Sequence, residues 1–294
     1  MGRMLDAVER ARQERLKRLQ SGGRDAAGAN APSPAPNLDA LPAVAAPAGP
    51  APAPATVAVG LSDRLVGAHD EQSPIAEQVR HIRTNLETVL ADHRTSSIVI
   101  TSPVAGEGKT LVACNLAAVL ADDPSQQVLL IDADMRKPGV NELFGTRLAP
   151  GLSEHLRGQC PWREAVHATG LPNLKVMPAG RLPHRPSNPT VLLGSDLLAT
   201  MLDEARSIFR WIVFDTPPLL PVTDAAVLAR RCTGLILVLR LGRTHYNQVQ
   251  RAQELLAEAR VPVLGCILND LTTINSGSEY YHQYYRRQDS KVEA

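Results

Sequence analysis

The sequence predicts an α/β domain with a doubly wound, mostly parallel sheet. Six apolar runs are continuous rather than alternating, which is typical of parallel strands covered by helices on both faces. Segments of helical character separate most of these runs, and this alternation of strand and helix favours the same fold class. The expected strands are 97–101, 128–132, 174–177, 211–215, 234–240 and 261–268, and the expected helices are 109–121, 189–208, 223–231 and 244–259.

The composition excludes several other classes of protein. The chain has 294 residues, 44% of them hydrophobic, and a formal net charge of +1. A nearly neutral chain has no overall basic field, so we expect no nucleic-acid partner. Its four cysteines form no CxxC pair, which argues against a zinc ribbon or an iron–sulfur carrier. No apolar run reaches the roughly 18 residues of a membrane span, so we expect a cytoplasmic protein whose membrane contact is peripheral.

Two segments are expected to precede the folded domain. Residues 1–20 read as a basic helix, with six basic and three acidic side chains up to Leu19. This helix could rest on anionic lipid, dock on a partner protein, or remain solvated. Residues 21–60 read as a disordered linker, since eight prolines stand among alanines between Pro32 and Pro54. The P-loop domain is expected over 61–275 and a polar tail over 276–294.

A phosphate-binding loop is predicted after the first apolar run. Gly106 and Gly108 would let backbone N–H groups approach phosphate oxygens, and the helix that begins near Lys109 would point its positive end at the same anion. Lys109 would contact the β- and γ-phosphates, and Thr110 would offer a hydroxyl to Mg²⁺. Pro103 stands where the usual pattern has its first glycine. The expected nucleotide-binding residues are Gly106, Glu107, Gly108, Lys109, Thr110 and Leu111.

Three acidic residues follow two of the predicted strands. Asp132 and Asp134 lie at the end of 128–132, and Asp215 ends 211–215. The carboxyl ends of parallel strands meet at one edge of the sheet, so these acids should meet the phosphate-binding loop. Asp215 suits a metal contact, Asp132 suits the base that accepts a proton from an attacking hydroxyl, and Asp134 could share either task. The predicted catalytic set is Lys109, Asp132, Asp134 and Asp215, and the predicted Mg²⁺ set is Thr110, Asp132 and Asp215.

The tail holds four of the five tyrosines of the chain, Tyr280, Tyr281, Tyr284 and Tyr285. Core packing does not explain such a cluster in a polar segment. A phosphate-handling domain followed by a strip of acceptor hydroxyls suggests that the protein phosphorylates its own end. A segment of tyrosine and arginine could also stack on RNA, although it is short and the rest of the chain is not basic.

Three segments resemble the bacterial tyrosine kinases (BY-kinases) of capsule and exopolysaccharide synthesis. They are the loop 102–110, the sequence IDADMRKP at 131–138 and FDTPP at 214–218. The resemblance covers roughly 70–285. It implies an ATP- and Mg²⁺-dependent protein-tyrosine kinase that phosphorylates its tail in trans and regulates polysaccharide chain length and export. It also implies a membrane chain-length or adaptor protein as partner and an opposing tyrosine phosphatase.

The segment 73–86 matches the ExxRxxRTN signature of the same family. In the family this signature implies a homo-oligomeric ring, so Glu77, Arg80 and Arg83 are the expected interface residues. The residues alone would equally suit a solvated helix face with a weak Glu77–Arg80 pair. The other face is apolar and should pack on the sheet through Ile75, Val79, Ile82, Leu86 and Val89.

Further segments agree with the resemblance in part. VTDA at 222–225 fits the family, and ILN at 267–269 would place Asn269 near the nucleobase, although an asparagine after a strand also forms turns. Arg136 and Lys137 could neutralise phosphate charge, contact a neighbouring subunit or remain solvated. The stretch 186–193 resembles PPNPxELL, with Val191 in place of the acid.

A partitioning or division-site ATPase is the principal alternative function. Such proteins resemble this chain in fold and hydrolyse ATP as a membrane- or DNA-linked switch. They usually carry a lysine early in the phosphate-binding loop, where this chain has Val104. A nucleotide-dependent scaffold without transfer activity is a third possibility, but the residues for transfer are all in place.

Overall fold

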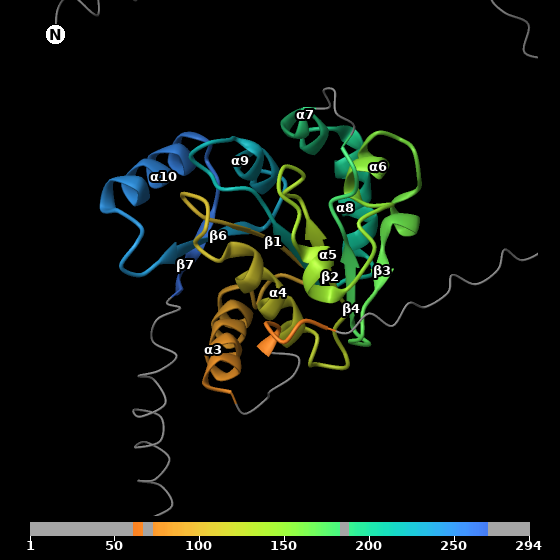
Figure 1. Ribbon diagram of the computed structural model, residues 1–294, viewed down its shortest axis with the longest axis horizontal. Helices are drawn as coiled ribbons and strands as arrows, with labels where there is room; N and C mark the ends of the chain where they lie inside the picture. The colour runs from red at the N-terminus through yellow and green to blue at the C-terminus, as the bar shows by residue number, and fades with distance from the viewer. Residues whose placement is uncertain (1–60, 67–72, 183–187, 270–294) are drawn as a thin grey trace, which may run out of the picture. The chain divides into compact units, whose positions relative to one another are not determined.

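The computed structural model describes residues 61–66, 73–182 and 188–269, so the predicted N-terminal helix, linker and tyrosine tail lie outside the described ranges. Within these ranges seven strands form one sheet in the order β3-β4-β2-β5-β1-β6-β7 (Figure 1). All neighbouring pairs are parallel except β3 and β4. The predicted fold class is confirmed. The strands are β1 (Ser96–Thr101), β2 (Val128–Asp132), β3 (His167–Ala168), β4 (Leu174–Met177), β5 (Trp211–Asp215), β6 (Gly234–Arg240) and β7 (Val263–Asn269).

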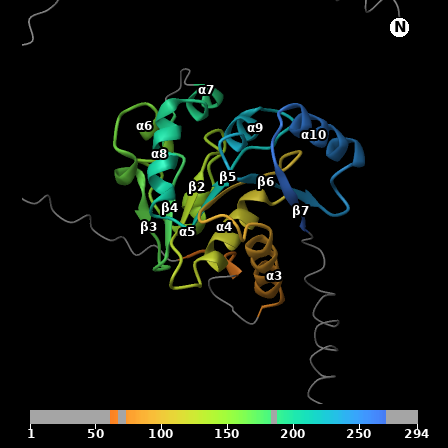
Figure 2. The ribbon, with the colours of Figure 1, turned by 180° about the vertical axis from the view of Figure 1, so that it is seen from behind.

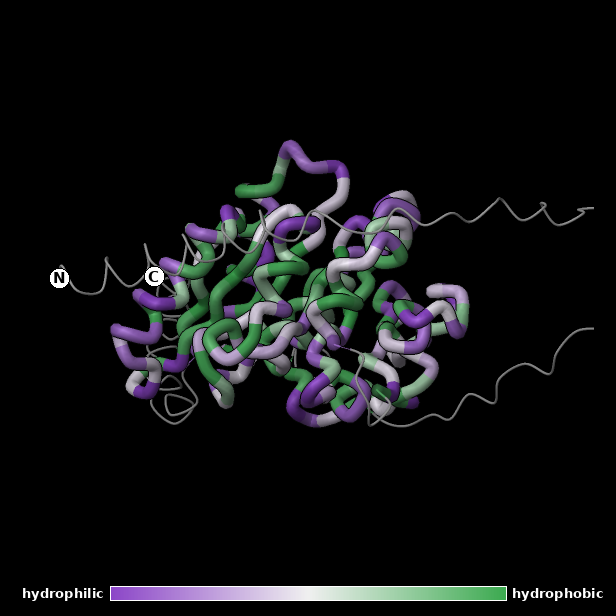
Figure 3. The backbone as a smooth tube through the Cα atoms, turned by 90° about the horizontal axis from the view of Figure 1, so that it is seen from above, coloured by the Kyte–Doolittle hydropathy of each residue, from purple (hydrophilic) through white to green (hydrophobic). Residues whose placement is uncertain are grey.

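Helices cover both faces of this sheet (Figures 1 and 2). Successive strand residues enter opposite hydrophobic clusters: Ile98 and Ile100 pack with α3, α4 and α5, whereas Val99 packs with α6 to α10. Figure 3 shows the hydrophobic positions concentrated in the strands between these layers. The helices are α3 (Pro74–Val89), α4 (Lys109–Leu120), α5 (Val140–Phe144), α6 (Leu152–Leu156), η1 (Trp162–Ala165), α7 (Pro189–Leu193), α8 (Asp196–Arg206), α9 (Asp224–Ala229) and α10 (Tyr246–Glu258).

The single helix expected over 189–208 is two helices, α7 and α8. Gly194 follows the first helix, and the Ser195 side chain accepts a hydrogen bond from the Leu198 N–H and so caps the second. A serine cap satisfies a backbone donor at a new helix start, which explains the interruption. The two-residue strand β3 and the short helices α5, α6 and η1 were not predicted, because periodicity is not visible over so few residues.

Helix α3 is amphipathic as predicted, but it packs mainly against α4, whereas it was expected to pack on the sheet. Leu86 is buried, and Val79 and Ile82 are half-buried against the same cluster. Val89 lies on the same face, lining a surface hollow with Ile82 and Leu86, but the residue is 60% exposed and so is not packed there as predicted. Within the described ranges, none of the helices combines the length and apolar composition that crossing a bilayer requires.

The edge strand β7 pairs with β6 through an irregular register. Val263 and Gly265 pair with successive residues of β6, so Leu264 is an additional residue on β7, as in a β-bulge. Gly234 of β6 leaves room for it, since a Cβ at that position would lie 2.5 Å from Leu264 Cγ. The bulge therefore determines on which face of the sheet each later side chain of β7 lies, including that of Asn269.

Candidate active site

The phosphate-binding loop joins the end of β1 to the start of α4. Gly106 and Gly108 have φ angles of 85° and 88°, a left-handed conformation that favours glycine. Gly108 precedes the 12-residue helix α4 and provides no side-chain cap, so the first N–H groups of α4 stay open toward the loop. This helix end and the loop N–H groups together form an anion-binding site.

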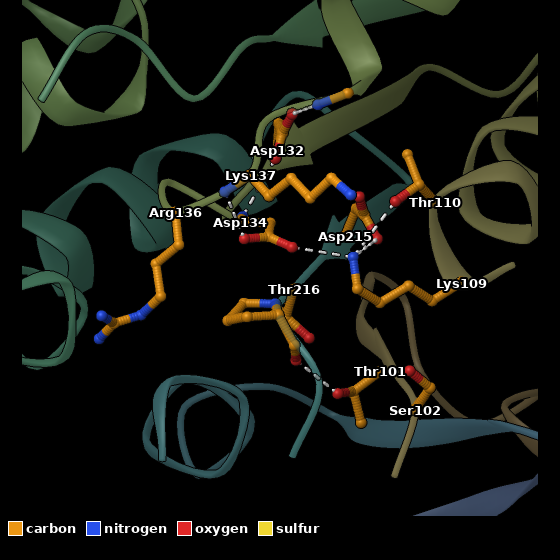
Figure 4. A network of polar contacts seen from close by, with 12 residues as sticks. Thr101, Ser102, Lys109, Thr110, Asp132, Asp134, Arg136, Lys137, Asp215 and Thr216 are labelled. Carbon is orange, nitrogen blue, oxygen red and sulfur yellow. Dashed lines mark hydrogen bonds and ion pairs between the residues drawn. The ribbon is translucent and has the colours of Figure 1, made fainter. Parts of the chain in front are cut away.

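Lys109 lies at the centre of the site and forms ion pairs with two aspartates (Figure 4). Its Nζ lies 2.9 Å from Asp134 Oδ2 and 3.7 Å from Asp215 Oδ1, and it donates a hydrogen bond of 3.2 Å to the Thr110 hydroxyl. Burial by itself lowers the pKa of Lys109, but the charges of Asp215 and Asp134 outweigh burial and raise the pKa above its ordinary value. The lysine therefore stays positively charged inside a mostly buried cluster.

Asp132 is fully buried at the end of β2 and organises the loop that follows. Its Oδ2 accepts hydrogen bonds from the Gly139 and Val140 N–H groups at 3.0 and 3.1 Å, and its Oδ1 accepts one from the Asp134 N–H at 3.0 Å. Burial, and then repulsion from Asp215, raise the pKa of Asp132 to about 7. The group can therefore take up a proton near neutral pH.

Asp215 lies opposite Asp132 across the β2–β5 pair and has the least satisfied carboxylate of the site. Both of its oxygens are buried, and among the described residues neither has a hydrogen-bond partner. Burial raises the pKa of Asp215 to about 6, although the Lys109 charge opposes the rise. Buried polar groups normally form hydrogen bonds, so two carboxylate oxygens without one suit a cation held partly by other ligands.

This donor set fits Mg²⁺ bound together with a nucleotide. In the described part of the chain no three His, Cys, Asp or Glu side chains are arranged to hold a metal on their own. Mg²⁺ in phosphoryl-transfer sites takes one or two carboxylates and completes its shell with phosphate and water. The three aspartates and Lys109 are thus brought together as predicted, whereas their individual roles remain predictions.

A second network fixes the phosphate-binding loop from the side of β6 and β7. The buried Glu107 carboxylate accepts hydrogen bonds from the Thr244 hydroxyl and from the Val104 N–H. Asn269 Nδ2 donates to the Glu107 carbonyl at 2.9 Å. Its amide fills the space beside Gly108, where a Cβ would lie 2.1 Å from Nδ2. Sequence reasoning missed Thr244, because nothing in its local sequence connects it to the loop.

The other predicted residues lie at varying distances from this centre. Leu111 is half-buried against the core on the α3–α5 face. Arg136 turns away from Lys109 (Figure 4) and pairs with Asp224, whereas the Lys137 N–H donates to Asp134 Oδ1 at 3.0 Å. The cluster Tyr280, Tyr281, Tyr284 and Tyr285 lies outside the described residues.

The expected interface residues on α3 contact their own chain. Arg80 pairs with Glu77 at 2.7 Å, and Arg83 pairs with Glu87 at 2.9 Å and donates to the Val119 carbonyl at 3.2 Å. These side chains are only partly buried, so contacts with another subunit remain a prediction.

Comparisons with known proteins agree with the geometry. The family model described as ParA: NUBPL iron-transfer P-loop NTPase matches residues 93–294. YwqD, a tyrosine-protein kinase of Bacillus subtilis (strain 168), is 37% identical over 226 residues, covering 77% of this chain and 92% of the relative. The kinase domain of the Escherichia coli tyrosine kinase ETK has a TM-score of 0.66 at 32% identity, covering 70% of this chain and 79% of that chain. The chimerical protein CapA2B2 has a TM-score of 0.65 at 30% identity, covering 70% of this chain and 89% of that chain.

Proposed function

The chain belongs to the ParA-type P-loop NTPases and, within them, to the bacterial tyrosine kinases, and on this premise we propose that it uses ATP to phosphorylate its own C-terminal tyrosine cluster in trans. The observation that carries the proposal is the buried Asp215 carboxylate, which accepts no hydrogen bond from the described residues and lies 3.7 Å from the Lys109 ammonium at the phosphate-binding loop. An aspartate and a lysine in this arrangement suit the binding of Mg²⁺ and a phosphate group better than a role in stabilising the fold.

Each residue of the site has a role in this reaction. The N–H groups of the loop and of α4 hold the phosphates, and Lys109 turns from Asp134 toward the β- and γ-phosphates. Thr110 and Asp215, with Asp132 nearby, would hold Mg²⁺, which when bound neutralises charge on the phosphate oxygens. Asn269, whose amide contacts the Glu107 carbonyl of the loop, would lie next to the nucleobase.

The chemical step transfers the γ-phosphoryl group to a tyrosine of the tail. The phenolic oxygen bonds to the γ-phosphorus, the bond to the β,γ-bridging oxygen breaks, and ADP leaves. The phenolic proton goes to Asp132, whose pKa of about 7 suits a base near neutral pH. Asp134, which Lys109 leaves on turning to the phosphates, shares either the binding of Mg²⁺ or the uptake of the proton.

Transfer in trans requires an assembly. We place the contact between subunits on the polar face of α3, at Glu77, Arg80 and Arg83, so that the copies form a ring and each offers Tyr280, Tyr281, Tyr284 and Tyr285 to the next. A membrane chain-length or adaptor protein would bring the kinase to the membrane surface, and a tyrosine phosphatase would reverse the modification. The cycle would control capsule or exopolysaccharide chain length and export.

Labelled ATP and Mg²⁺ provide the test, with and without the cytoplasmic part of the membrane partner. We expect phosphate on the tyrosines of the tail, mapped by mass spectrometry, and none in the Lys109→Met variant. Release of free phosphate with an unmodified tail would instead indicate a partitioning-type ATPase. Nucleotide binding without turnover, even with the partner present, would indicate a scaffold.

A further inference from the structure

Three segments that are far apart in the sequence meet at one buried carboxylate beside the active site. Asp224 begins α9 and is fully buried. Its Oδ2 accepts a hydrogen bond from Arg136 Nε at 3.0 Å, and its Oδ1 accepts one from the Thr190 hydroxyl. Arg136 belongs to the loop after β2, and Thr190 belongs to α7. The contact therefore ties the loop that carries Asp134 to two helices.

Asp224 is the fixed end of this contact. Its side chain is 0% exposed, whereas that of Arg136 is 42% exposed. Ala225 and Leu228 of α9 are buried in the core, and α9 packs against α7 and β1. A buried carboxylate is costly unless it is paired, so Arg136 and Thr190 offset its burial. In return, the anchored carboxylate fixes the direction of the Arg136 guanidinium.

The loop needs such an anchor because its other ion pair is given up during the reaction. Asp134 is held by Lys109 at 2.9 Å, but Lys109 must turn to the phosphates when a nucleotide binds. Arg136 points away from that centre (Figure 4) and pairs with Asp224, so we expect this pair to stay intact when a nucleotide binds.

We propose that Asp224 is a positioning residue for the transfer step. Acting through Arg136, it holds the loop of Asp132 and Asp134 in its reactive form after Lys109 has moved to the nucleotide. This inference rests on the proposed kinase function. It also gives one physical reason for three sequence segments, 131–138, 186–193 and 222–225, to be present together.

The central test is Asp224→Asn, which keeps the size of the side chain and removes its charge. Since a displacement of about 1 Å can cost on the order of 100-fold in rate, we expect kcat for tail phosphorylation to fall about 10- to 100-fold. The KM for ATP and the Kd for ADP should not change, because the phosphate-binding loop keeps its contacts. A merely structural residue would lower the melting temperature without this split between kcat and KM.

Arg136 variants test whether the effect passes through the guanidinium. Arg136→Gln should lower kcat as Asp224→Asn does, and Arg136→Lys should recover part of the rate by restoring a charge. The double variant should be no slower than the slower single variant, because both remove the same contact. Arg163→Gln is the matched control, since Arg163 pairs with Glu204 at the surface, away from this site, and should keep wild-type kcat.

Several results would overturn the inference. One is wild-type kcat in Arg136→Gln, and another is a change in the KM for ATP as large as the change in kcat in Asp224→Asn. If Asp224→Asn does not fold, Arg136→Gln decides by itself, and wild-type kcat in this variant would reject the role. A wild-type protein that never phosphorylates its tail refutes the proposed function instead, and this is seen before any variant is compared.

Discussion

Replacement of Asp215 by asparagine should stabilise the nucleotide-free protein while abolishing phosphate transfer. Burial raises the pKa of Asp215 from 3.8 to about 6, and the Lys109 charge opposes this rise only in part. The folded state therefore binds this proton more tightly than the unfolded chain does. As the pH rises from about 4 to about 6, the wild-type protein loses stability, because the buried carboxylate must ionise.

The size of the effect follows from the shift in pKa. One pKa unit corresponds to about 1.4 kcal/mol, so the shift of about two units corresponds to roughly 3 kcal/mol above about pH 7. Asparagine has nearly the same shape and does not ionise. We therefore expect the free energy of unfolding of Asp215→Asn to exceed that of the wild type by roughly 3 kcal/mol at about pH 8, and to equal it near pH 4.

Urea denaturation across this pH range, without nucleotide and with EDTA, measures the difference. Asp203→Asn is the matched control: Asp203 is 75% exposed and pairs with Arg206 on α8, so its replacement should change stability by no more than about 1 kcal/mol at any pH. The reasoning is refuted if Asp215→Asn is less stable than the wild type at about pH 8. Attraction to Lys109 would then outweigh the cost of burial.

Two further substitutions test the phosphate-binding loop. Gly108→Ala should destabilise the protein by about 1–3 kcal/mol and abolish ADP binding, because its Cβ would meet Asn269 Nδ2 at 2.1 Å. Gly158→Ala is the control, since Gly158 has a similar φ angle but open space around it, and this variant should retain its ADP affinity in calorimetry. Equal ADP affinities in the two variants would contradict the steric argument. Thr244→Val leaves the buried Glu107 without its hydroxyl partner and should cost about 1–3 kcal/mol in urea denaturation, whereas the exposed Thr88→Val should cost less than about 0.5 kcal/mol. Equal costs for the two threonines would show that the Glu107 contact contributes nothing.

The centre of the sheet was predictable because strands β1, β2 and β5 are buried on both faces. The four strands β2, β4, β5 and β6 have the predicted bounds, since most of their residues are apolar and polar residues or a proline flank the apolar runs. Prediction failed where a single contact decides the structure: the Ser195 cap divides one expected helix into two, and Val89 lies at the exposed end of α3. Apolar periodicity reports neither capping nor the exact width of a packing face.

The arrangement of the candidate site was likewise predictable only in part. Asp132 and Asp215 could be placed together because the ends of adjacent parallel strands meet at one edge. The pairing of Arg136 with Asp224 could not be foreseen, because the two residues are far apart in sequence and an aspartate at a helix start is ordinarily exposed. Charge alone does not reveal which acid is buried.

Because of the bulge in β7, a change in the length of this edge strand would move its later side chains to the opposite face of the sheet. Side chains of a strand alternate between faces, so the additional residue at Leu264 determines that Asn269 turns its amide toward Glu107. An insertion or deletion here would present a different side chain to the phosphate-binding loop. Edge strands usually tolerate changes in length. In this protein the length of β7 must be preserved, because it determines the contact between Asn269 and Glu107.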